Sequence, residues 1–170
     1  MKICVIGHTH QLKTINDFPP RALLALAEAD LVLHAGNVGR LPLLRDIQNQ
    51  FGLTFAVYGN QDSEEVRHYL EDEKVVEFAN RRIGITFEGG GRPVIKLGAP
   101  RPETIARQLL GRFPDVDCIV FGNPPTPFNQ VIRGVLVFNP GPVAGETGQR
   151  GSIGLLDVTD RSLTGRIVPL

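Results

Sequence analysis

The 170-residue sequence predicts an α/β sandwich whose second sheet is mixed. In the first half, apolar runs of strand length alternate with segments of helical period, which is the pattern of βαβ units on a parallel sheet. In the second half, helices are few and the apolar runs follow one another closely, which favours antiparallel pairing. Clusters of glycine, proline and polar residues come directly after several of these runs. The length suits one hydrophobic core, so we expect a single domain over residues 1–170.

Each expected element rests on a local pattern. Three helices are expected at residues 20–29, 41–51 and 102–110. The first has a Pro-Pro start, and the second carries leucine, isoleucine and phenylalanine at helical spacing. Apolar runs, most of them rich in valine and isoleucine, predict strands at residues 2–6, 31–34, 53–57, 75–78, 83–87, 118–121, 131–138, 153–158 and 164–168.

The composition excludes several classes of protein. With 42% hydrophobic and 21% charged residues, the chain lies well outside the range of disordered proteins. Its 18 basic residues balance its 18 acidic ones, so no net field attracts nucleic acid or an anionic membrane. No apolar run approaches the ~18 residues that span a bilayer. Cys4 and Cys118 lie in separate apolar runs, as reduced core residues do. We therefore expect a cytoplasmic protein that binds neither nucleic acid nor membranes.

The polar residues that follow the strands are the main guide to function. In open α/β sheets, ligands bind beyond the carboxyl ends of the strands, where loops distant in the sequence converge. A polar site is therefore expected at one rim of the molecule. The residues expected to meet there are His8, His10, Asn37, Asn60, Asp62, Glu88 and Asn123.

These clusters resemble the sequence blocks of the calcineurin-like metallophosphoesterases, in particular the small phosphodiesterase branch that includes the small subunit of retromer. MKICVIGHTH resembles the first block of the family, LVLHAGNV the second and VYGNQD the third. RRIGITFEGG, IVFGNPPTP and VFNPGPV resemble the three later blocks. The six blocks stand in the family's order and extend through nearly the whole chain. The resemblance implies a four-layer α/β/β/α sandwich of two mixed sheets.

The resemblance also implies where the family's metal ligands would lie, and most of them are replaced. The family holds two metal ions with Asp, His and Asn side chains, and a metal-activated water attacks phosphorus. Here only His10 and Asn60 keep the family residue, and Asn37 stands in place of the aspartate that bridges the two ions. The other family metal-site positions carry His8, Phe87, Asn123 and Pro125.

These replacements argue against a two-metal centre. Two dications ~3.7 Å apart repel by roughly 18 kcal/mol at an effective dielectric of ~20, and a bridging carboxylate makes the pair tolerable. Asn37 is neutral, and Phe87 and Pro125 offer no side-chain ligand atom. We therefore expect no catalytic residue and no required cofactor. One open alternative is a single zinc, nickel or manganese ion held by His8 and His10, with Asn37 as a weak third ligand.

Structural roles are expected for the neighbouring residues. His34 is expected to be a hydrogen-bonded structural histidine, and Asp62 to bind backbone amides. Glu88 precedes three glycines and is expected in a loop rather than as a ligand. The same EGGGRP stretch is a weak candidate for an anion cradle.

Two functions of different classes follow from these observations. The first is a binding or scaffold protein that keeps the phosphoesterase fold without its metals, with another protein as partner and with self-association as a further expectation. The alternative is a weak single-metal phosphodiesterase or phosphatase that uses His8 and His10. The number of replaced ligands favours the first.

Overall fold

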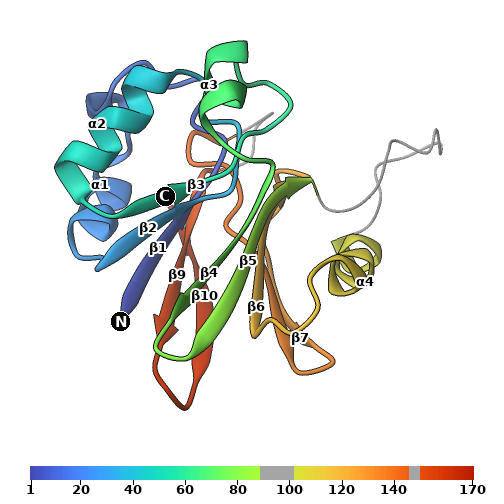
Figure 1. Ribbon diagram of the computed structural model, residues 1–170. Helices are drawn as coiled ribbons and strands as arrows, with labels where there is room; N and C mark the ends of the chain where they lie inside the picture. Colours follow the sequence, from blue (N-terminus) through green and yellow to red (C-terminus); the bar gives the residue numbers. More distant parts are fainter. Residues whose placement is uncertain (89–101, 146–149) are drawn as a thin grey trace.

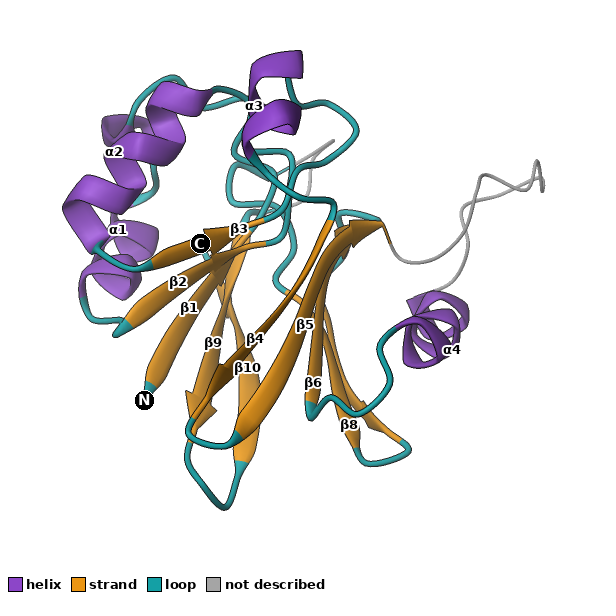
Figure 2. Ribbon diagram, viewed as in Figure 1, coloured by secondary structure: helices purple, strands orange, loops and turns teal. Residues whose placement is uncertain are grey.

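The structure, a computed structural model, describes residues 1–88, 102–145 and 150–170, which form four layers (Figure 1). Two five-stranded sheets pack face to face. Helices α1 (Pro20–Ala27) and α2 (Leu41–Phe51) cover the outer face of one sheet, and α4 (Pro102–Arg112) covers the outer face of the other (Figure 2). Helix α3 (Glu64–Tyr69) lies at one end of the sandwich, and a short 3₁₀ helix, Ile15–Asp17, precedes α1. Within the described ranges, none of the helices is long and apolar enough to cross a membrane. The α/β/β/α sandwich that the resemblance implies is confirmed.

The first sheet consists of β1 (Lys2–Ile6), β2 (Leu31–His34), β3 (Thr54–Ala56), β9 (Ser152–Val158) and β10 (Leu163–Pro169). Its strand order is β10-β9-β1-β2-β3. β1, β2 and β3 are parallel, so the expected βαβ units are present. β9 pairs antiparallel with β1, and β10 pairs antiparallel with β9. The last part of the chain therefore completes the sheet that the first part begins.

The second sheet consists of β4 (Glu73–Phe78), β5 (Arg81–Glu88), β6 (Cys118–Asn123), β7 (Phe128–Ile132) and β8 (Val135–Asn139). Its strand order is β4-β5-β6-β8-β7. The antiparallel pairing expected for the second half holds for β4 with β5 and for β7 with β8. It is wrong for β5, β6 and β8, which are parallel. The reason is that α4 returns the chain between β5 and β6, and the β7–β8 hairpin places β8 beside β6.

One expected strand, residues 131–138, is instead the two arms of the β7–β8 hairpin. Arg133 and Gly134 have φ values of 52° and 83°. Two successive positive φ values are what a type I′ hairpin turn requires. Arg133 and Gly134 interrupt the apolar run, and this interruption is the sequence signal for the turn.

Apolar clusters hold the layers together. Ile3 and Val5 of β1 face the cluster between the two sheets, whereas Cys4 and Ile6 face α1 and α2. Because β1 is buried on both faces, its sequence is continuously apolar instead of alternating. Leu109 of α4 belongs to a third cluster, which lies against the second sheet.

The parallel strands direct their carboxyl ends to one end of the sandwich. β1, β2 and β3 of the first sheet, and β5 and β6 of the second, all end at the upper rim in Figure 1. The loops after these strands carry the polar residues that the sequence places at a functional site. The fold therefore brings the two halves of the candidate site together from different sheets.

Candidate functional site

His8 lies at the centre of this rim, in the loop after β1. Its side chain is buried, and its backbone φ of 55° is left-handed, which is uncommon for a residue other than glycine. The His8 amide donates a hydrogen bond to the carbonyl of Gly36, 3.0 Å away, which ties this loop to the loop after β2. The ring Nε2 lies 2.8 Å from the carbonyl oxygen of Gly122 at the end of β6. Since a carbonyl only accepts, Nε2 carries the proton in this contact and Nδ1 is left as an acceptor.

Asn37 faces His8 from the loop after β2. Its Oδ1 accepts a hydrogen bond from the backbone amide of Gln61 at 3.0 Å, which fixes the orientation of the side-chain amide. Its Nδ2 therefore points towards His8 Nδ1, 3.4 Å away. Both ring nitrogens of His8 and the side-chain oxygen of Asn37 are thus engaged within the protein. A chain of hydrogen bonds runs from Gln61 through Asn37 and His8 to Gly122.

Phe87 fills the space beside this chain of hydrogen bonds. Its ring centroid lies 5.5 Å from that of His8, and its side chain is buried. A Cβ atom added at Gly36 would lie 2.6 Å from the ring, and one added at Gly122 would lie 2.9 Å from it. The ring is therefore packed directly against the backbone of the loop after β2 and of the end of β6, at the position where the resemblance places a metal-binding histidine.

His10 lies next to His8 and differs from it in its hydrogen bonding. The two ring centroids are 6.1 Å apart. His10 Nδ1 is buried and has no hydrogen-bond partner among the described residues. This nitrogen is the best candidate in the site for binding a ligand atom.

The remaining predicted positions lie at the edge of the site. Asn60 is exposed, and its backbone oxygen accepts a hydrogen bond from Arg67 at 2.6 Å. Asn123 ends β6 opposite Glu88 of β5, and Pro125 follows in the next loop. Glu88 is thus the last residue of a strand and not part of a loop as expected. The glycines that follow it, with Arg92, lie outside the described residues.

Asp62 holds two site loops in place, as expected from its position. Its carboxylate accepts hydrogen bonds from the amides of Gly39, at 2.5 Å, and Gly59, at 2.7 Å. Gly59 also has a steric role, because a Cβ atom there would lie 2.2 Å from Asn37 Oδ1. By holding the loop of Gly59 in place, Asp62 also keeps that backbone against the Asn37 side chain.

His34 has the structural role expected of it. It is fully buried at the end of β2, and its Nδ1 accepts a hydrogen bond from the Gly36 amide at 3.2 Å. Its Nε2 therefore carries the proton and donates to Thr9 Oγ1 at 2.8 Å, and the Thr9 hydroxyl donates to the carbonyl of Val38 at 3.0 Å. Burial, with a smaller contribution from His8, lowers the pKa of His34 to about 3. His34 is therefore neutral at physiological pH.

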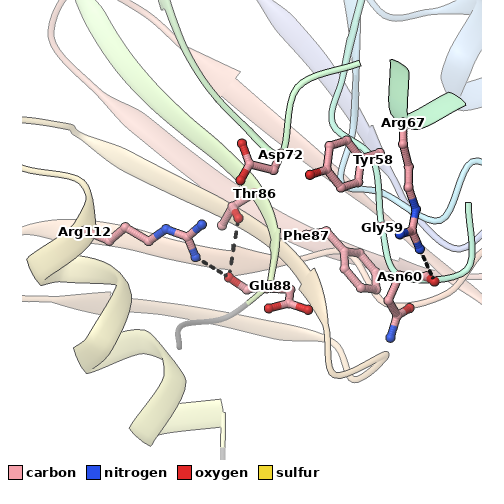
Figure 3. Close-up of a pocket in the computed structure, with 9 residues that line it drawn as sticks. All are labelled: Tyr58, Gly59, Asn60, Arg67, Asp72, Thr86, Phe87, Glu88 and Arg112. Carbon is pink, nitrogen blue, oxygen red and sulfur yellow. Dashed lines mark hydrogen bonds between the residues drawn. The ribbon is translucent and has the colours of Figure 1, made fainter. Parts of the chain in front are cut away.

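A pocket of about 260 Å³ opens beside the site (Figure 3). Arg67 of α3 donates to the backbone oxygens of Asn60 and Asp62, and lies over the Tyr58 ring. Arg112 of α4 reaches in from the opposite side and donates to the backbone oxygen of Glu88 at 3.3 Å. The pocket is lined by Tyr58, Gly59, Asn60, Arg67, Asp72, Thr86, Phe87, Glu88 and Arg112.

The donor set of the site does not fit the family's pair of metal ions. The described residues contain no group of three or more His, Cys, Asp and Glu side chains placed to hold a metal. The chain of hydrogen bonds uses the His8 and Asn37 atoms that would otherwise be ligands. Covalent chemistry at cysteine is not supported either, because burial raises the pKa of both thiols, that of Cys4 to about 12. The arrangement is suited to holding the site loops together.

Several residues of the site were not predicted from the sequence. Gln61 and Gly122 contribute backbone groups, which any residue type carries, so the sequence holds no signal for them. Arg67 and Arg112 come from helices whose sequences are rich in charge. Arg67 is the single arginine of α3, and Arg112 is one of two in α4. Charged residues on a helix are usually solvated, and only the tertiary structure distinguishes those that reach a pocket.

Comparison with known proteins agrees with this fold. Residues 1–161 match the calcineurin-like phosphoesterase superfamily domain. A probable metallophosphoesterase of Methanocaldococcus jannaschii is 28% identical over 172 residues, which cover 100% of this chain and 82% of that protein. The crystal structure of Vps29 from Chaetomium thermophilum superposes with a TM-score of 0.77 at 22% identity, covering 100% of this chain and 89% of that one. An archaeal phosphodiesterase gives a TM-score of 0.72 at 22% identity and full coverage of both chains. At these identities the two structural likenesses show the fold alone.

Proposed function

The chain belongs to the calcineurin-like phosphoesterase superfamily, and from this premise we propose that it is a binding or scaffold protein that has lost the family's catalysis. The observation that carries the proposal is the contact between His8 and Asn37. By resemblance, Asn37 stands where the family has its bridging aspartate. Its oxygen accepts from Gln61 and its NH₂ group faces His8. A metal ion at this point would have to break both contacts and would gain no negative charge.

Electrostatics supports the same conclusion. A pair of dications needs at least one anionic ligand between them to offset their repulsion. The candidate positions His8, Asn37 and Asn60 carry no carboxylate. Phe87 places an aromatic ring, packed against the backbone of Gly36 and Gly122, where a further ligand would be needed. The site has the packing of a structural core and lacks the charge of a hydrolytic centre.

The proposal includes the nature of the partner. A chain that has lost its metals still offers the rigid surface of the sandwich, and the retromer subunit that the sequence resembles works by contacting other proteins. We propose that this chain acts as one domain over residues 1–170 and binds another protein.

Metal analysis and a hydrolysis assay test the proposal. Protein purified without a histidine tag should contain much less than one equivalent of metal. With Mg²⁺, Mn²⁺ or Zn²⁺ added, it should hydrolyse bis-p-nitrophenyl phosphate no faster than a protein-free blank. Because a two-metal site accelerates such reactions by many orders of magnitude, even a damaged one would be detected. A metal-dependent rate above the blank would contradict the proposal.

One observation favours a second candidate, a weak single-metal phosphodiesterase or phosphatase. His10 Nδ1 is buried without a hydrogen-bond partner in the described part of the chain, and a bound ion would satisfy it. In that case the metal-dependent rate should disappear in His10→Ala. It should persist in His68→Ala, which removes an exposed histidine of α3. Zinc binding measured by calorimetry should follow the same pattern in the two variants.

A further inference from the structure

β7 is an edge strand with no protection against pairing. Its five residues, Phe128–Ile132, include no charged residue and no proline. It pairs with β8 on one side, and the described residues form no ladder on its other side. Val131, its fourth residue, has an exposed fraction of 68%, the largest among the exposed large hydrophobic side chains that the structure describes. Edge strands normally carry charges, prolines or bulges, because their free backbone groups otherwise pair with another chain.

The other three sheet edges of the described fold are protected. β3 is only three residues long. β4 carries Glu73, Lys74 and Glu77, three charges in six residues. β10 carries Arg166 and ends in Pro169, and Asn129 Nδ2 of β7 donates to the backbone oxygen of its Gly165 at 2.7 Å. The open, uncharged edge of β7 is therefore a local feature and not a general property of this fold.

The hairpin geometry identifies the free backbone groups of β7. The turn has two residues, and Ile132 and Val135 form its closing pair. In such a hairpin the closing pair is joined by backbone hydrogen bonds, and bonded and non-bonded pairs then alternate along the strands. The backbone groups of Ile132 and Gln130 therefore face β8. Those of Asn129 and Val131 point away from it, which leaves two N–H and two C=O groups free at the edge.

We propose that β7 pairs antiparallel with β7 of a second copy of this chain, across a two-fold axis at Gln130. In this register Asn129 of each copy lies opposite Val131 of the other. All four free groups of each strand are then used, in four hydrogen bonds between the copies. The two strands form the centre of a continuous ten-stranded sheet made from the second sheet of each copy.

Charge and symmetry favour a second copy as the occupant. A strand that adds here must itself have a free edge of matching length, and a second copy supplies one by identity. No like charges meet along the paired strands, because β7 has none. The Arg133 side chains of the two copies lie at opposite ends of the pairing. Gln130 meets Gln130 of the second copy, and two side-chain amides can bond to each other.

The self-opposition of Gln130 gives a sharp test by sedimentation velocity over a concentration series. Wild-type protein should shift from monomer to dimer as its concentration rises. Gln130→Lys and Gln130→Glu should each remain monomeric at the concentration where the wild type is dimeric, because like charges then oppose each other. An equimolar mixture of the two variants should recover the dimer. Gln130 is exposed, so both variants should keep the wild-type fold, which circular dichroism checks.

Val75→Lys is the matched control. Val75 is also an exposed valine on an edge strand, in β4, and this variant should dimerise as the wild type does. A wild-type protein that stays monomeric over the whole series would overturn the proposal. So would a single-charge variant that still dimerises, or a mixture of the Lys and Glu variants that stays monomeric.

Discussion

Acid should destabilise this protein through His34 before its carboxylates are protonated. The folded state holds the pKa of His34 at about 3 by burial, whereas an unfolded chain gives histidine a pKa of ~6.5. The unfolded state therefore binds more protons than the folded state between pH ~6.5 and ~3. This contribution to stability is present in full above pH ~6.5 and is lost as the pH falls towards 3.

The size of the effect follows from the two pKa values. A separation of about 3.5 pH units is worth up to ~5 kcal/mol below pH 3, at 1.36 kcal/mol per unit. pH 5 lies about 1.5 units below the pKa of histidine in the unfolded chain, so the loss of stability at pH 5 relative to pH 7.5 is ~2 kcal/mol. For a chain of this length, that loss lowers Tm by roughly 4 to 8 °C.

Urea unfolding at pH 7.5 and pH 5 measures this loss, and His34→Gln isolates it. The glutamine variant is less stable at pH 7.5, because it loses part of the hydrogen-bond chain through Thr9 and Gly36. Its stability should change by ~2 kcal/mol less than that of the wild type between the two pH values. His68→Gln, which removes an exposed histidine, should keep the wild-type dependence. If His34→Gln loses as much stability at pH 5 as the wild type does, the reasoning from burial is wrong.

Three further substitutions test the contacts around the site and in the core, each by denaturant unfolding. Thr9→Val leaves the buried Nε2–H of His34 without an acceptor and should cost about 1–3 kcal/mol, whereas Thr9→Ser should restore most of it. Gly59→Ala places a Cβ atom 2.2 Å from Asn37 Oδ1 and should cost about 1–3 kcal/mol; an unchanged stability would mean that this loop adjusts freely. Phe138→Ala empties a fully buried position between the two sheets and should cost about 3–5 kcal/mol. A loss under 1 kcal/mol there would contradict the close packing of the core.

The sequence by itself determined the elements that depend on local patterns. The helix expected at residues 41–51 is found with those bounds, because apolar residues at helical spacing precede Gly52, which has a positive φ. The strands at residues 2–6 and 31–34 are also found as expected, because each is a short run buried on both faces. The six-block resemblance predicted the family and the four layers. The meeting of the loops at one rim followed from their positions after parallel strands.

Tertiary structure alone decided which strands are neighbours and how the site side chains are bonded. β9 joins the first sheet through backbone hydrogen bonds to β1, about 150 positions away in the sequence, and β10 then pairs with β9. Backbone groups carry no information about residue type. The same applies at the site. The proton on His8 Nε2 is placed by the carbonyl of Gly122, and the orientation of Asn37 is set by the amide of Gln61. A hydrophobic pattern fixes which face of an element is buried, but the partner of a polar atom depends on distances that exist only once the chain has folded.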